Sequence, residues 1–511
     1  MQAGFSGKRP SEEWVSACIR GNCRGHTASP RRSRGLPASL RSPRPPMMLP
    51  RLLRLLPLSL LILAAPRLSA AAPRSTALDL RDGDTLVFLG DSITHQCLYT
   101  QHVENFFYTR HPERRIRFHN AGVSGDRAAD ALARFDADVA AYRPKYVTVL
   151  FGMNDGQYED FKAEAFARYA ADMAKLLDRI QALGAVAIVL SPTLFDYPVV
   201  EARKDDATYR FRERSFAPNY NAVMAYYGAW GRDQAERRRL PFVNLWGPLN
   251  DFTTEGRAAN PAFTLVPDAI HPGPGGQFIM ASALLEALRP ERRNVSALSV
   301  TRAGDKWSAP AALKLEGLAG DATRVTFTHT AAALPWVIPA ESTTVATKWE
   351  WREDGRVGYD LSKAGHRQSN EMLRVTGLAP GQYEVKIDGQ SIGRPVSHVV
   401  LGSKIELQAN EATPQHRQAL AVALLNRERN DRAVRPLRDL WSTLKGARRK
   451  FAQDPAGYAA FRQQTQLEID RLEQLARDYE ARIHAAAQPV AHRYEITRVA
   501  DAPAPARGRK Q

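Results

Sequence analysis

The fold is decided by the stretch Thr85-Leu86-Val87-Phe88-Leu89-Gly90-Asp91-Ser92-Ile93-Thr94, in which an apolar run stops at a Gly-Asp-Ser turn. An apolar run without polar alternation is typical of a strand buried on both faces of a sheet. A helical pattern over 95–110 follows the turn. Strand, turn and helix in this order predict the first unit of a parallel α/β sheet.

The same unit recurs along the next two hundred residues. Further strands are predicted at 116–120, 146–151, 185–190 and 242–244. Between and after them, helical patterns cover 127–140, 161–183, 219–238 and 275–288. Strands that alternate with helices predict a parallel five-stranded sheet covered on both faces, a three-layer α/β/α domain over 80–290. Ligands of such sheets bind outside the carboxyl ends of the strands.

Three more short motifs lie at that predicted edge of the sheet. They are Ser124-Gly125-Asp126, Gly152-Met153-Asn154-Asp155 and Asp268-Ala269-Ile270-His271. The first two follow the second and third strands, and the last lies in the loop after the fifth strand. Taken singly, each is ordinary turn or helix-cap chemistry. Their convergence on one edge favours a shared chemical function.

The residue types in these motifs suit attack on an ester carbonyl. Serine is a poor nucleophile without a base, so we expect His271 to accept the proton of Ser92 and Asp268 to orient the histidine. The backbone N–H groups of Ser92 and Gly125 and the side-chain amide of Asn154 are the predicted oxyanion donors. A side chain at Gly125 would obstruct the approach of the backbone to the substrate. The pattern therefore predicts a serine hydrolase.

The neighbouring carboxylates and the cysteine have no predicted chemical role. Asp91, Asp126 and Asp155 are interpreted as turn-stabilising residues. Cys97 is the single cysteine after residue 46, so neither a disulfide framework nor a cysteine metal site is expected. No metal and no cofactor are predicted.

The four motifs resemble the signature blocks of the SGNH (GDSL-type) hydrolase superfamily over roughly residues 80–290. Ser92, Gly125, Asn154 and the Asp268/His271 pair fill its signature positions. The resemblance implies a three-layer α/β/α fold, no metal, and ester hydrolysis through an acyl-enzyme. It leaves the substrate open, because the superfamily includes carbohydrate acetylesterases, lysophospholipases, lipases and thioesterases.

A second serine motif is rejected as the nucleophile. Gly389-Gln390-Ser391-Ile392-Gly393 matches the G-x-S-x-G nucleophile elbow, and His398 is near in sequence. That elbow requires a strand, a sharp turn and a helix. Here 382–387 alternates like a strand and Asp388-Gly389 is a hairpin signal, so a β-hairpin is predicted.

The N-terminal region predicts export. Residues 1–46 carry nine Lys and Arg against two Glu and lack apolar periodicity, which suggests a misassigned start. Residues 47–72 combine a short basic region, an apolar core over 55–65 and small residues near Ala70–Ala72, as in a secretory signal peptide. The apolar core is too short for a membrane span. We therefore expect a secreted or periplasmic protein with no integral membrane segment.

Much of the positive charge belongs to that region. The chain has a net charge of +17, to which residues 1–46 contribute seven charges and Arg51, Arg54 and Arg67 three more. The remainder is near +7. No basic stretch interleaves with aromatic residues as a nucleic-acid platform would, so no nucleic-acid partner is predicted.

Beyond Pro290 the pattern changes twice. A β-rich region is predicted over 296–405, with strands at 312–315, 324–329, 343–351, 374–376 and 383–387. Its tryptophans favour core packing over carbohydrate stacking; they are Trp307, Trp336, Trp349 and Trp351. A helical extension is predicted over 410–490, with a break at Pro436. A disordered tail is predicted over 500–511.

One face of the extension predicts a docking surface. Its apolar residues recur at spacings of three and four, at Ile469, Leu472, Ala476, Tyr479 and Ile483. The repeat is short, so docking on the hydrolase domain is favoured over a dimeric coiled coil. The oligomeric state stays open.

The segment Thr193–Phe216 bears on specificity, because it is long and charged and leaves the predicted catalytic edge. A lid over a long acyl chain should be apolar, so this segment favours a short-acyl ester of a carbohydrate. A lysophospholipase or thioesterase is the alternative within catalysis. A non-catalytic envelope- or polysaccharide-binding protein with a vestigial hydrolase fold is the alternative of another class.

Overall fold

A five-stranded parallel sheet forms the centre of the first half of the computed structural model. All neighbouring strands pair in parallel. The strand order is β2-β1-β3-β4-β5, with β1 (Thr85–Gly90), β2 (Arg117–Gly122), β3 (Tyr146–Leu150), β4 (Val186–Leu190) and β5 (Phe242–Val243). Every predicted strand of this domain is confirmed to within a residue or two at its ends.

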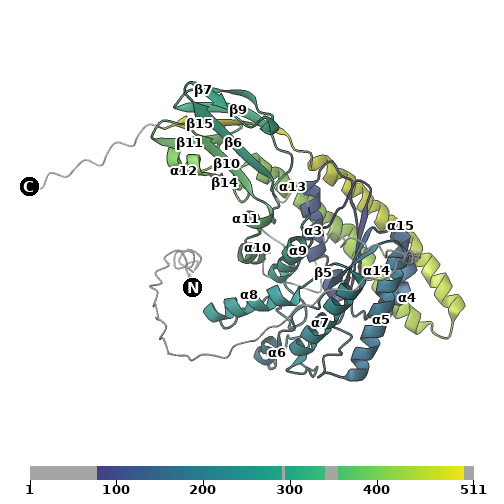
Figure 1. Ribbon diagram of the computed structural model, residues 1–511. Helices are drawn as coiled ribbons and strands as arrows, with labels where there is room; N and C mark the ends of the chain where they lie inside the picture. The colour runs from purple at the N-terminus through teal and green to yellow at the C-terminus, as the bar shows by residue number, and fades with distance from the viewer. Residues whose placement is uncertain (1–76, 291–293, 340–354, 500–511) are drawn as a thin grey trace, which may run out of the picture. The chain divides into compact units, whose positions relative to one another are not determined.

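Helices cover both faces of this sheet (Figure 1). On one face α3 (Leu98–Arg110) packs against α9 (Pro274–Leu288), and on the other α4 (Ala128–Asp138) packs against α5 (Ala163–Ala182). After β1 the chain adds β2 on one side of it, and then adds β3, β4 and β5 in turn on the other side. Right-handed crossovers therefore place α3 on one face, and α4, α5 and α7 (Tyr220–Arg238) on the opposite face. The predicted three-layer α/β/α fold is confirmed.

Three helices of this domain differ from the predicted pattern. The predicted helix over 95–110 is divided into α2 (Ser92–His95) and α3, because Cys97 between them adopts a left-handed backbone with φ +60°. The helices α6 (Tyr197–Arg203) and α8 (Trp246–Ala259) were not predicted.

The structure describes residues 77–290, 294–339 and 355–499. The predicted leader (1–46), signal peptide (47–72), tail (500–511) and strand at 343–351, with Trp349 and Trp351, lie outside the described residues. No helix within the described residues combines the length and apolar character that crossing a bilayer requires.

The β-rich region consists of two sheets that share one apolar core. One sheet has the order β14-β10-β6-β7 and the other β12-β11-β15-β9-β8, with β13 also paired to β11. Val300 and Val375 of the first sheet and Phe327 and Ile496 of the second belong to the same buried cluster. The strands are β6 (Ser296–Ala303), β7 (Lys306–Ser308), β8 (Glu316–Gly320), β9 (Arg324–Thr330), β10 (Glu371–Thr376), β11 (Gln382–Ile387), β12 (Gln390–Ser391), β13 (Val396–Ser397), β14 (Ile405–Glu406) and β15 (Ala491–Arg498).

Two predictions for this region need correction. The strand predicted at 312–315 is wrong: Ala311–Leu313 is a 3₁₀ turn that follows Pro310 and ends at Lys314, whose φ of +47° prevents an extended run. The region is also not confined to 296–405. The strand β15 follows the helical extension in sequence and pairs between β9 and β11 (Figure 1).

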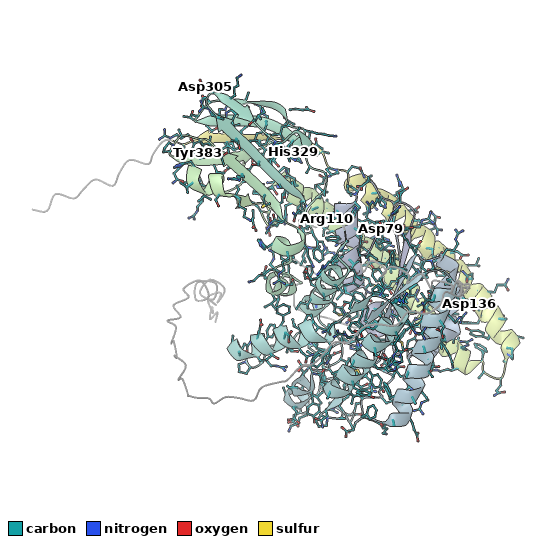
Figure 2. All side chains as sticks on the ribbon, viewed as in Figure 1. Asp79, Arg110, Asp136, Asp305, His329 and Tyr383 are labelled. Atoms are coloured by element: carbon teal, nitrogen blue, oxygen red, sulfur yellow. The ribbon has the colours of Figure 1, made fainter. Side chains whose placement is uncertain are left out.

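A segment inside the predicted β-rich region belongs to the hydrolase core instead. Trp336 is fully buried there, and its indole N–H donates to the His102 carbonyl oxygen at 2.9 Å. The buried Arg110, labelled in Figure 2, donates to Ser369 Oγ at 2.8 Å. Core packing is thus confirmed for Trp336. Two short helices of this segment pack near α9: α10 (Arg356–Ser362) and α11 (Ala364–Gln368).

The C-terminal helices pack on the hydrolase domain, as the docking prediction expected. Of the predicted face, Ile469, Leu472, Tyr479 and Ile483 are buried. The expected break at Pro436 is wrong, because a π-helical turn (Asn430–Val434) shifts the hydrogen-bond register just before the proline and lets the helix continue. These helices are α13 (Pro414–Arg429), α14 (Arg435–Lys450) and α15 (Pro455–Ala486), whereas the short helix α12 (His398–Ser403) packs on β10 of the β-rich region.

Candidate active site

Ser92, His271 and Asp268 form one continuous hydrogen-bonded chain. The Nε2 atom of His271 lies 2.8 Å from Ser92 Oγ, and its Nδ1 atom lies 2.8 Å from Asp268 Oδ2. All three residues are buried, with exposed fractions of 7%, 4% and 5% respectively. The structure thus brings together residues 179 positions apart in a geometry in which the histidine can take the serine proton.

The carboxylate of Asp268 is held in place by its own loop. Its Oδ1 atom accepts hydrogen bonds from the backbone N–H groups of Ile270 and His271, at 3.0 and 2.7 Å. Burial by itself raises the pKa of this carboxyl, but the charge and hydrogen bonds of His271 outweigh it and leave the pKa below its ordinary value. The group therefore stays ionised beside the imidazole, where it can stabilise a positive charge.

The three predicted oxyanion donors follow β1, β2 and β3. Ser92 begins α2, where a backbone N–H has no partner inside the helix. Gly125 has a φ of +71°, so its left-handed backbone, rather than a steric conflict, explains the glycine. The Asn154 amide donates to the Asp126 carbonyl oxygen at 3.0 Å, and its oxygen accepts from Tyr158 at 3.0 Å.

A second glycine, Gly122, lets the end of β2 lie close to helix α2. A Cβ atom at Gly122, the last residue of β2, would lie 2.3 Å from the backbone nitrogen of His95. Any side chain at this position would push α2, and with it Ser92, away from the sheet.

Two of the three neighbouring aspartates stabilise turns, as predicted. Asp91 caps α2 by accepting from the Ile93 N–H at 2.9 Å. Asp155 accepts from the N–H groups of Ala128 and Gly152, at 3.1 and 3.0 Å. Burial raises the pKa of Asp91 to about 7 and that of Asp155 to about 6.

Asp126 differs from the turn-stabilising role predicted for it. Its two carboxylate oxygens bind Arg134 Nε and Lys445 Nζ, each at 2.8 Å. Two cations neutralise this fully buried carboxylate beside Gly125, and one of them comes from α14.

Aromatic side chains of the segment 193–216 contact the catalytic loop, which sequence reasoning missed. The Phe211 ring lies nearly parallel to the His271 imidazole, with centroids 6.4 Å apart. The Tyr209 hydroxyl donates to the Asp268 carbonyl oxygen at 3.1 Å. The guanidinium of Arg214 lies 4.0 Å from the centre of the Tyr158 ring. The segment thus carries aromatic rings close to the catalytic histidine, in addition to the charged residues seen in the sequence.

Helix α14 supports the turns that carry Ser92 and Gly125. Arg435 donates to the Gln96 carbonyl oxygen at 3.2 Å, and Arg438 donates to the Gly122 carbonyl oxygen at 3.0 Å. Arg438 also forms a fully buried ion pair with Asp138. No local signal in the sequence identifies these contacts, because the partners are about three hundred residues apart.

Among the described residues, no group of three or more His, Cys, Asp and Glu side chains is arranged to hold a metal ion. Cys97 is buried and forms no disulfide, and burial raises the pKa of its thiol to about 12. Ser391 lies on the exposed strand β12, which pairs antiparallel with β11, so the predicted hairpin is confirmed.

Comparisons with known proteins agree with the geometry. An acetylxylan esterase from Geobacillus stearothermophilus is 27% identical over 233 residues, which cover 41% of this chain and 96% of that protein. The uncharacterized lipoprotein YqeF from Bacillus subtilis (strain 168) is 27% identical over 134 residues, 25% of this chain and 54% of that protein. The structure of a gut microbial diltiazem-metabolizing enzyme has a TM-score of 0.70 at 22% identity and covers 83% of this chain and 100% of its own.

That likeness shows that the fold beyond the hydrolase domain is shared with another protein. Residues 88–278 match the model of the GDSL-like lipase/acylhydrolase family. The chain is an ester-bond hydrolase, and its residues 88–278 are similar to the GDSL-like lipase/acylhydrolase family.

Proposed function

We propose that this chain is a serine esterase that hydrolyses short-acyl esters of carbohydrates through an acyl-enzyme. The observation that carries the proposal is the hydrogen-bonded chain from Ser92 Oγ through His271 to Asp268, with both distances at 2.8 Å. Such a chain activates a serine and fixes the tautomer of its base.

In the first half-reaction Ser92 Oγ attacks the ester carbonyl carbon, and its proton passes to His271 Nε2. Asp268 stabilises the imidazolium that forms. The tetrahedral intermediate then collapses, the C–O bond to the alcohol breaks, and His271 returns the proton to the leaving oxygen. In the second half-reaction a water molecule, deprotonated by His271, attacks the acyl carbon. The bond from that carbon to Ser92 Oγ then breaks, His271 returns the proton to Ser92 Oγ, and the acid is released.

We assign the negative oxygen of each tetrahedral intermediate to three donors. They are the N–H groups of Ser92 and Gly125 and the Asn154 amide. A preorganised donor of this kind contributes about 3–4 kcal/mol to the transition state. The Tyr158 hydroxyl at the Asn154 oxygen orients the amide, so that its nitrogen rather than its oxygen is directed toward the neighbouring turns.

Two observations support a sugar ester over a lipid. The relative that is matched over 96% of its own length is named an acetylxylan esterase. Beside His271 the segment places Phe211 with the Arg210 guanidinium 4.5 Å from its ring centre, a charged setting that suits a hydroxylated substrate better than a long acyl chain.

A panel of substrates tests the proposal. Nitrophenyl esters graded from acetyl to palmitoyl are compared with acetylated xylo-oligosaccharides, and kcat/KM is measured for each. We expect the acetyl ester and the acetylated sugars to be preferred. A preference for long acyl chains would favour the lipid-esterase alternative, and no turnover of any ester would favour the binding-protein alternative.

We also infer that the protein acts outside the cytoplasm. The signal-like residues 47–72 and the similarity to a lipoprotein support this placement. N-terminal sequencing of the native protein is expected to read a start near Ala71–Pro73. A mature chain that begins at Met1 or Gln2 would contradict both the signal peptide and the proposed location.

A further inference from the structure

A cavity of about 460 Å³ lies between α4 and the two helices α14 and α15. Its size is within the range of small-molecule sites. Asp136, which lines it, is labelled in Figure 2 on the side of the hydrolase domain that faces the C-terminal helices. This cavity takes no part in the ester chemistry described above.

Positive charge remains in the cavity after its carboxylates are paired. Arg134 and Lys445 neutralise Asp126 at 2.8 Å each, and Lys445 also lies 3.4 Å from Asp130. Asp136 pairs with Arg179 outside the cavity. Every lining carboxylate among the described residues thus has a cation within ion-pair distance.

Three arginines of the lining are left with little or no carboxylate compensation. Arg449 is largely exposed and lies 3.8 Å from Asp130, which Lys445 already holds more closely. Arg448 is bound to a backbone carbonyl oxygen, and within the described part of the chain Arg462 has no ion pair. Guanidinium groups of this kind bind a carboxylate through two parallel hydrogen bonds.

Aromatic residues accompany these cations. Trp441 and Tyr458 line the same cavity. Trp441 is 8% exposed, and its indole N–H has no hydrogen-bond partner among the described residues. A buried donor without a partner is unfavourable, and a bound acceptor would satisfy it. Aromatic faces beside polar groups suit a sugar ring better than a bare inorganic anion.

The cavity adjoins the proposed oxyanion site. Its lining residue Asp126 follows Gly125 directly, and Lys445 Nζ lies 4.0 Å from the position of a Cβ atom built on Gly125. The cavity therefore begins one residue away from the proposed oxyanion donor Gly125.

We propose that this cavity is a subsite for a carboxylate-bearing sugar residue, so that the enzyme acts on acetylated acidic oligosaccharides. Its place in the substrate path rests on the proposed function, whereas binding of the acidic sugar does not. Arg449 and Arg462 hold the carboxylate, and Trp441 and Tyr458 contact the ring.

Binding is measured first, with ligands that carry no ester. Trigalacturonate and xylotriose are titrated by calorimetry into the wild-type protein, into Arg449→Gln/Arg462→Gln, and into the control Arg471→Gln/Arg477→Gln. The control removes the same charge from exposed positions of α15 outside the cavity. Thermal unfolding of each variant checks that it is folded.

We expect trigalacturonate to bind the wild type at least about tenfold more tightly than xylotriose, which corresponds to about 1.4 kcal/mol. The cavity variant should lose this difference and the control variant keep it. The preference should weaken as salt rises from about 50 to 300 mM. Equal binding of the two sugars, or a preference that survives in the cavity variant, would overturn the proposal. Inorganic phosphate that binds as tightly as trigalacturonate would overturn the sugar assignment.

Kinetics separate this inference from the proposed function. With acetylated oligogalacturonate, the cavity variant should show a KM raised about tenfold with kcat unchanged. If the wild type hydrolyses no acetylated sugar but binds trigalacturonate as expected, the proposed function fails and the binding site stands. If it hydrolyses acetylated xylo-oligosaccharides but shows no preference for the acid, the subsite is wrong and the function stands.

Discussion

Ser92 and Ser391 each lie in a short glycine-containing turn with a histidine in the same region, yet their surroundings differ. Ser92 follows an interior strand of the parallel sheet, is 7% exposed, and contacts His271 at 2.8 Å. Ser391 lies on an exposed edge strand of two residues, where its hydroxyl donates to the Gly393 carbonyl oxygen at 3.0 Å. The Nδ1 atom of His398 accepts from the Gly381 N–H instead.

The comparison teaches that position in the sheet carries more information than the letters of a motif. The carboxyl end of a central parallel strand directs a turn residue toward the loops of neighbouring strands, where a base and oxyanion donors can converge. A hairpin turn at a sheet edge faces solvent and has no such neighbours. Ser391 matches the nucleophile elbow in sequence but not in context.

The largest effect is expected from exchanging the two serines for alanine. Ser92→Ala should lower kcat for nitrophenyl acetate by at least about 10⁴-fold, because no other group takes its place as the nucleophile. Ser391→Ala should retain wild-type turnover and serves as the matched control. Comparable activity in the two variants would remove the assigned role of Ser92.

A smaller loss is expected at the third strand. Asn154→Ala should lower kcat by about 10²–10³-fold with KM little changed, because one donor to the developing oxyanion is lost. Steady-state kinetics on nitrophenyl acetate measure both constants. If KM rises while kcat is unchanged, Asn154 binds the ground state and the assigned oxyanion site is wrong.

The next effect concerns stability at the Ser92 turn. Burial raises the pKa of Asp91 from 3.8 to about 7, so its contribution to stability is full below the unfolded-state pKa and is lost as pH rises through about 7. Asp91→Asn keeps the cap acceptor without the charge. The free energy of unfolding of this variant should equal that of the wild type near pH 4 and exceed it by up to about 4 kcal/mol at pH 8.

Urea unfolding at several pH values tests this prediction. Asp388→Asn is the control, because Asp388 lies on the partly exposed hairpin before Ser391 and bonds His492 at 2.7 Å. It should show no such gain at high pH. A stability difference between Asp91→Asn and the wild type that is the same at every pH would contradict the assigned cause.

The smallest effect is expected from chelation. The Ser92 site is built from a serine, a histidine, a carboxylate and N–H donors, and no group of three or more His, Cys, Asp and Glu side chains among the described residues is arranged to hold a metal ion. Excess EDTA should leave kcat/KM for nitrophenyl acetate unchanged. Activity lost in EDTA and restored by an added divalent metal would show that the proposed chemistry is incomplete.

The amino-acid pattern alone was enough to predict the parallel sheet and the edge at which Ser92, Asn154 and His271 lie. The signals are local: an apolar run of four to six residues predicts a buried strand, and a Gly-Asp-Ser turn marks its end. Once the strands are parallel and the crossovers right-handed, the geometry places those turns at one edge. Local patterns and chain topology are enough for this part of the molecule.

The surroundings of that edge depend on long-range packing, which the local pattern does not predict. The ion pair of Lys445 with Asp126 joins residues 319 positions apart, and β15 enters the sheet between β9 and β11 only after the chain has formed α13, α14 and α15. Phe211 lies over His271 because of how its loop packs, not because of any periodicity. Such contacts depend on the complementary shape and charge of distant surfaces, which a single chain's local pattern does not specify.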